Sequence, residues 1–137
     1  MKRRASRGSS QAKVEILAPP SGATVTGVGL VEGSADIPPD SFLWVLARRK
    51  DVHGWWPQGA GAVPVDQNRW RVSVTYGGPD DNGSDFELAA LVVGQPTHDL
   101  WTDWVARVSE TGLFPPVQLP PAGFALGEAF RTVTKAR

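Results

Sequence analysis

The chain offers few side chains for acid–base or metal chemistry, and they do not form a catalytic pattern. Its two histidines, His53 and His98, lie far apart without the short spacing of a metal-binding pair such as H-x-x-x-H. No G-x-S-x-G segment marks a nucleophilic serine, although triad members need only converge in space. The absence of cysteine excludes disulfides and thiolate ligands. We therefore expect no catalytic residue, no cofactor and no enzymatic activity, and a structural or solvent-exposed role for both histidines.

One segment, GGPDDNGSDFE, contains enough side-chain oxygens to suggest calcium binding. Placing Asp80 at the first position of an EF-hand loop puts Asp85 where the sharp turn needs glycine, and Leu91 where the bidentate glutamate belongs. The template therefore fails, and we expect no metal site. The Asn82-Gly83 pair is typical of a hairpin turn with positive backbone φ angles; a divalent-ion site is the alternative for this segment.

Six tryptophans in 137 residues are the second concentration of useful side chains. Adjacent residues of a strand point to opposite faces, so at most one of Trp55 and Trp56 faces the core. The other is expected to be half exposed, with an indole N–H that needs a partner. Packing accounts for the remaining four, which fall in predicted strands or on a predicted helix: Trp44, Trp70, Trp101 and Trp104.

A sugar-binding platform needs a flat aromatic ring flanked by hydrogen-bonding side chains, which Arg49, Asp51 and Gln58 could supply. We take Trp55, Trp56, Gln58 and Arg49 as the candidate residues for binding a ligand or partner. The alternative is that the W-W-P-Q segment only packs, closing the core at one edge of the fold.

From residue 14 onward the chain alternates short apolar runs with breaks rich in glycine and proline, which predicts a β-sandwich or barrel. The run WRVSVTY alternates apolar and polar residues, as a half-buried strand does. FLWVLA and FELAALVV are apolar on both faces, which indicates central strands whose outer side is also covered. We place Trp44 on the inner face of its strand. The predicted strands are 14–17, 28–35, 42–48, 70–76, 86–93 and 130–134, with a further short edge strand at 60–65.

The spacing of apolar residues predicts one helix over 99–111. Leu100, Trp104 and Val108 form the stripe of an amphipathic helix, and Gly112 follows where a left-handed C-terminal cap belongs. We expect this helix to cover the strands with two apolar faces. The prolines of the following FPPVQLPPAG exclude helix and central strand there.

The order of these motifs resembles bacterial immunoglobulin-like β-sandwich domains of the surface- or effector-associated type. The residues that carry the resemblance are the opening VEILAPPSGATVTG, the V-x-G-x-A of VEGSAD, the Trp-bearing FLWVLAR and the closing FRTVT. The resemblance covers about 14–134. It implies an all-β, two-sheet antiparallel sandwich of about seven strands with one short helix before the last strand. The chain departs from the familiar pattern by lacking paired cysteines and by carrying that helix.

The resemblance brings no catalytic residues and implies an adhesive, spacer or partner-binding module. We expect a flexible basic tail at 1–13 and the sandwich domain at 14–137. The tail holds five of the 14 basic residues, which leaves nine basic against 14 acidic residues in the domain. A net-acidic body argues against nucleic-acid binding.

No apolar span approaches the length of a membrane helix or of a signal-peptide core. We expect no membrane insertion and, if Met1 is the true start, a cytoplasmic protein. The sequence thus predicts a non-catalytic protein-interaction or scaffold module. A carbohydrate-binding module that uses the edge around Trp55 and Trp56 is the alternative.

Overall fold

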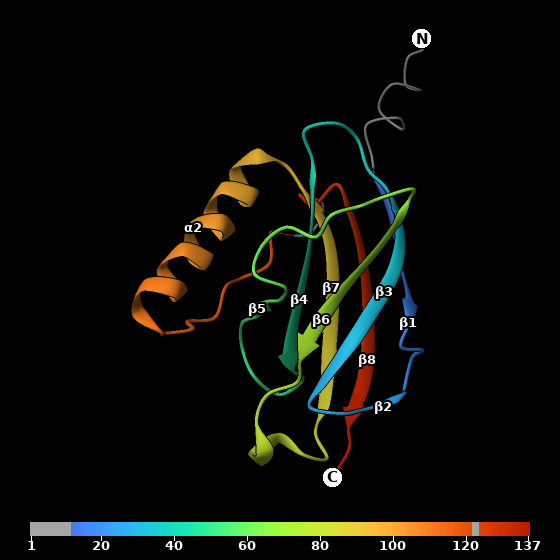
Figure 1. Cartoon of the computed structure of the whole chain (residues 1–137), viewed down its shortest axis with the longest axis vertical. Helices are drawn as coiled ribbons and strands as arrows, with labels where there is room; N and C mark the ends of the chain where they lie inside the picture. The colour runs from blue at the N-terminus through green and yellow to red at the C-terminus, as the bar shows by residue number, and fades with distance from the viewer. Residues whose placement is uncertain (1–11, 122–123) are drawn as a thin grey trace.

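The computed structural model describes residues 12–121 and 124–137 of the chain. The tail expected at 1–13 therefore lies outside the described residues except for its last two positions, and Lys13 already begins the first strand. The described elements are eight strands, one α-helix and one short 3-10 helix (Figure 1). In chain order they are β1 Lys13–Ala18, β2 Thr24–Val25, β3 Val28–Asp36, β4 Phe42–Arg49, β5 Trp56–Pro57, β6 Arg69–Thr75, η1 Pro79–Asp81, β7 Asp85–Val93, α2 Gln95–Thr111 and β8 Gly127–Lys135.

The strands form two sheets that face each other. One has three strands in the order β1-β3-β6, and the other has five in the order β2-β8-β7-β4-β5. All neighbours pair antiparallel except β2 and β8. With β1, β3 and β6 as strands A, B and E, and β4, β5, β7 and β8 as C, C′, F and G, this is the immunoglobulin-like arrangement. The predicted two-sheet sandwich with a helix before its last strand is confirmed. In the described part of the chain, no strand takes position D beside β6.

A hydrophobic core fills the space between the sheets. Strand β6 contributes to it as its alternating pattern predicts: the apolar residues from Trp70 to Tyr76 are buried, and the polar residues between them are exposed. The opposite sheet contributes Leu43, Val45, Phe86, Leu88 and Val133.

A second apolar cluster lies on the outer face of the five-stranded sheet, beneath α2. Trp44 is fully buried in this cluster, so the prediction that it occupies the inner face of β4 is wrong. Its neighbours Leu43 and Val45 point into the inner core, and alternation sends Trp44 to the other side. The Trp101 ring of α2 meets the Trp44 ring edge-on, with centroids 5.5 Å apart. The helix therefore covers the strands with two apolar faces, as predicted.

Helix α2 begins at Gln95, four residues before the predicted start, with a proline in its first turn where no backbone donor is lost. It ends as predicted, with Gly112 in the left-handed conformation at φ 71°. The predicted packing stripe is only partly right, because Leu100 is 66% exposed and Trp101 is the buried residue. This helix, the one α-helix in 12–121 and 124–137, lacks the length and apolar character needed to span a membrane.

The short edge strand lies at β5 and not at 60–65. Three consecutive residues after it, Gly59, Ala60 and Gly61, have positive φ angles of 80°, 64° and 147°, which interrupt an extended strand. The chain returns to β4 only at Val63, which forms a single bridge with Leu43. The two-residue β2, parallel to the end of β8, was not predicted.

The Asn82-Gly83 pair forms a turn, but the predicted hairpin is wrong, because the flanking strands β6 and β7 belong to different sheets. Asn82 has φ −58° and ψ 134°, and Gly83 has φ 85°. The Ser84 N–H donates to the Asp81 carbonyl over 3.0 Å. These are the angles and the hydrogen bond of a type II turn, which needs a positive φ only at its third residue.

A candidate binding cleft at the edge of the sandwich

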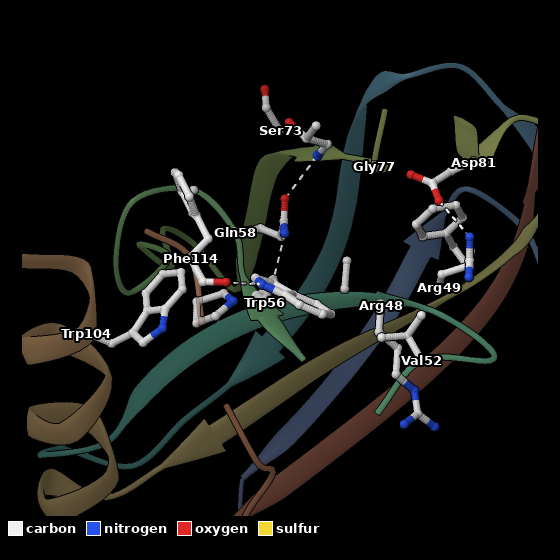
Figure 2. Close-up of a pocket in the computed structure, with 15 residues that line it drawn as sticks. Arg48, Arg49, Val52, Trp56, Gln58, Ser73, Gly77, Asp81, Trp104 and Phe114 are labelled. Carbon is white, nitrogen blue, oxygen red and sulfur yellow. Dashed lines mark hydrogen bonds and ion pairs between the residues drawn. The ribbon is translucent and has the colours of Figure 1, made fainter. Parts of the chain in front are cut away.

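A cleft of about 580 Å³ opens at the edge of the sandwich between β5 and β6 (Figure 2). The end of β4 and β5 form one wall, and the end of β6 with the loop that follows forms the other. Two aromatic residues from beyond the sheets, Trp104 of α2 and Phe114, complete the lining. The cleft lies where a strand D would close the sandwich, and it contains three of the four candidate residues: Arg49, Trp56 and Gln58.

The two adjacent tryptophans point to opposite sides of the sheet, as the geometry of a strand requires. Trp55 is 6% exposed and belongs to the outer cluster beneath α2. The guanidinium of Arg48 lies 4.4 Å from the centre of its ring, a cation–π contact. Trp55 is therefore a packing residue and is not part of the cleft, whereas Trp56 is partly exposed and lines it.

Two indole groups hold the chain segment that returns from α2. The Trp56 N–H donates to the Phe114 carbonyl over 2.8 Å, and the Trp104 N–H donates to the next carbonyl, that of Pro115, over 2.7 Å. The Phe114 ring lies against that of Trp104 with centroids 6.3 Å apart and is 62% exposed. The result is an aromatic wall at one end of the cleft (Figure 2).

Two members of this wall do not follow from the sequence pattern. Trp104 lies on the helix stripe, which predicts packing, and Phe114 lies in a proline-rich connection with no regular pattern. The signal that could have found Phe114 is an apolar aromatic residue just after a helix cap, in a segment that cannot form a core strand.

Gln58 connects the edges of the two sheets. Its side-chain carbonyl accepts a hydrogen bond from the Thr75 N–H of β6 over 2.9 Å, and its amide nitrogen donates to the Trp56 carbonyl over 3.0 Å. Its own backbone N–H donates to Val45 of β4 over 2.8 Å. A primary amide has the donor and acceptor of a peptide group, so Gln58 occupies the β6 edge as one peptide unit of a neighbouring strand would.

Arg49 lies at the other end of the cleft in an ionic cluster. Its guanidinium contacts Asp51 at 2.6 Å and Asp81 at 2.9 Å. The hydrogen bond and charge of Asp51, with Asp81 beside it, raise the pKa of Arg49, and the hydrogen bond from Arg49 lowers the pKa of Asp51. Asp81 also accepts the Gly78 N–H over 2.8 Å, and Lys135 donates to the Gly78 carbonyl over 2.6 Å. Arg49 is thus engaged in fixing the loop around η1.

The charges around the cleft are paired within the protein. Besides the Arg49 cluster, Arg48 and Glu87 form an ion pair of 2.8 Å. In 12–121 and 124–137, no three histidine, aspartate or glutamate side chains are placed to hold a metal ion. An aromatic wall with internally neutralised charges suits an apolar group accompanied by hydrogen-bonding groups, and it is poorly suited to a free ion.

No protein-family model and no curated protein sequence matches the chain. Among solved structures, it is similar to a chimeric titin Z1Z2 functionalized with a KLER exogenous peptide from decorin, with a TM-score of 0.35 and 12% sequence identity over 92% of this chain and 93% of that one. The class of protein defined by the strand order is the immunoglobulin-like β-sandwich, here with an α-helix between strands F and G.

Proposed function

We propose that this domain is a non-catalytic protein-interaction module, of the bacterial immunoglobulin-like type that its sequence resembles, and that it binds its partner at the cleft between β5 and β6. The observation that supports this most is the aromatic wall of Trp56, Trp104 and Phe114, with a largely exposed Phe114 ring. Protein interfaces are enriched in aromatic residues, and tryptophan is among the residues enriched at the positions that contribute most of the binding energy.

The polar side chains of the cleft favour a protein over a sugar. A carbohydrate site needs hydrogen-bonding groups that are available to hydroxyls, whereas the guanidinium of Arg49 is engaged by Asp51 and Asp81. Carbohydrate binding is therefore the outcome that the test must separate from protein binding.

The test compares Phe114→Ala with the matched control Phe124→Ala, since Phe124 is 74% exposed and does not line the cleft. Each variant and the parent are immobilised, and the proteins that they capture from the source lysate are quantified. Binding of the same three proteins to a glycan array is measured in parallel. We expect the parent and Phe124→Ala to capture the same protein and Phe114→Ala to capture about tenfold less, as for a hot-spot residue. Equal capture by all three contradicts the proposal, and glycan binding that only Phe114→Ala loses assigns the cleft to carbohydrate.

A further inference from the structure

Strand β6 has one edge without a neighbouring strand. Its other edge pairs with β3 along its whole length, and the Tyr76 N–H that follows it points the same way, to Gly27. The backbone groups of Arg69 point to the opposite side, where they bond to Asp66. Because backbone groups alternate along a strand, those of Arg71 and Ser73 also face this side. In the described part of the chain, no group bonds to the N–H of Arg71 or Ser73 on this edge.

The next N–H along the same edge, that of Thr75, already donates to a side chain that imitates a peptide group. The Thr75 N–H donates to the side-chain amide of Gln58, which stands in for one peptide group of a missing strand. Ser73 and Thr75 both line the cleft. A peptide bound along this edge would meet the unpaired N–H groups of Arg71 and Ser73, and at Thr75 it would take the place of the Gln58 amide.

We propose that the β6 edge accepts an extended segment of a partner protein as an added antiparallel or parallel strand, in the empty position D. The inference rests on the proposed function of the cleft and specifies how it binds. Backbone hydrogen bonds to Arg71, Ser73 and Thr75 hold the segment, and alternate side chains enter the cleft toward the aromatic wall. The edge from Arg71 to Thr75 fits a segment of about five or six residues, an ordinary strand length.

Charge selects a partner segment that carries an acidic residue. The side chains of Arg69 and Arg71 are exposed on the outer face of β6, and neither forms an ion pair with another described residue. A residue opposite Arg71 on the added strand lies on the same face, where an opposite charge is favourable. A second copy of this chain fits less well, because pairing β6 with β6 brings four arginines together.

The test uses a displayed library of random peptides of about ten residues, selected on the immobilised full chain. Binding of the selected peptides is then measured for the parent, Phe124→Ala and Ser73→Pro. Phe124 is exposed and does not line the cleft, whereas Ser73→Pro removes the N–H on the open edge, where proline is tolerated. We expect Phe124→Ala to bind like the parent and Ser73→Pro to bind about tenfold more weakly or worse. Arg71→Glu should bind the acidic peptides more weakly than the parent does.

A second measurement covers the case in which Ser73→Pro does not fold. N-methylation of each peptide bond of a selected peptide is scanned against the parent protein, and strand addition predicts losses at every second position. Losses without this period contradict strand addition.

The outcomes separate this inference from the proposed function. If the selected peptides bind Phe114→Ala more weakly but bind Ser73→Pro as they bind the parent, the cleft is a binding site and strand addition is wrong. If they bind both variants as they bind the parent, the results contradict both the proposed cleft and strand addition. If no peptide is selected, strand addition is wrong. The lysate experiment with Phe114→Ala and Phe124→Ala then still tests whether the cleft binds a protein. A parent dimer that Ser73→Pro dissociates also overturns the inference, because a second copy would then be the occupant.

Discussion

The Trp44 indole donates a hydrogen bond to Nδ1 of His98 over 3.1 Å, which joins the central strand β4 to the first turn of α2. The His98 ring also stacks on Phe42, with centroids 3.6 Å apart and planes 8° from parallel. One side chain of the helix thus supplies both the hydrogen-bond partner of a buried indole and the cover for a neighbouring ring.

Replacing His98 should therefore weaken the docking of α2. His98→Ala leaves the buried Trp44 N–H without its acceptor, and such a loss costs about 1 to 3 kcal/mol. The free energy of unfolding, measured by denaturant titration with tryptophan fluorescence, should fall by about that amount. The control is His53→Ala, since His53 is exposed and its removal should change stability by less than about 0.5 kcal/mol. Equal stabilities of the two variants would contradict the role of His98.

The two adjacent tryptophans should respond differently to truncation. Trp55→Ala removes a buried ring from the outer cluster and should cost about 3 to 5 kcal/mol. Trp56→Ala removes a partly exposed ring and one hydrogen bond to Phe114, so we expect a smaller loss of about 1 to 2 kcal/mol. Unfolding midpoints of both variants, measured side by side, check this order. A larger loss for Trp56→Ala would show that the assignment of the two faces is reversed.

Gly33, the glycine of the V-x-G-x-A motif, should be harder to replace than Gly29, the other glycine of β3. A Cβ atom at this position would overlap the Glu15 carbonyl and the ring of Trp70, its partner on β6. Because one obstacle is the backbone of β1 and the other is a buried ring, Gly33→Ala should cost about 1 to 3 kcal/mol or more. Gly29→Ala in the same strand is the matched control, since its Cβ would meet only Tyr76 at 3.8 Å. Thermal unfolding of the two variants measures the difference, and equal midpoints would be incompatible with this packing.

Alkaline pH should destabilise the domain through Tyr76. Burial raises the pKa of Tyr76 to about 12 from its ordinary value of 10.0. The folded state therefore holds the proton more tightly, and this contribution is complete below pH about 10 and lost as the pH rises through about 12. The loss should be about 2 to 3 kcal/mol.

The measurement for this prediction compares the unfolding free energies of the parent and Tyr76→Phe between pH 10 and 12. The variant should lack the tyrosine part of the decline. Tyr76 is the only tyrosine, so phenolate absorbance of the parent reports its titration directly. Ionisation near pH 10 in the folded protein would contradict the predicted shift.

The sequence predicted the strands best where one face is polar. The alternation of β6 assigns each side chain to a face, and the assignment holds for Trp70 and Tyr76. In β4 both faces are apolar, so the sequence pattern does not show which residues point to which side of the sheet. Nothing in the sequence therefore shows that Trp44 faces the helix. The same problem affected α2: Leu100 and Trp101 are both apolar, and the polar His98 belongs to the buried side of the helix.

The candidate cleft could be predicted only in part. Trp56 and Gln58 are two residues apart and share a sheet edge, so the sequence alone predicts that they lie together. Trp104 and Phe114 reach the cleft because the chain turns back after Gly112, and the two hydrogen bonds that fix this return involve residues 58 and 11 positions apart in the chain. Such tertiary contacts leave no periodic signal. The positive φ of Ala60, a residue that rarely adopts one, likewise had no sequence signature.

The insertion of α2 also determines how this sandwich can associate. Strands β7 and β8 are adjacent and antiparallel, so a short turn would suffice to join them, yet the chain spends 33 residues, 94–126, between them. Helix α2 gives the outer face of the five-stranded sheet a covering from the same chain. Two copies cannot stack through the surface beneath α2 while the helix is docked, so the faces left for other molecules are the rim of the sandwich and the exposed outer face of the three-stranded sheet, which carries Val28 and Leu30.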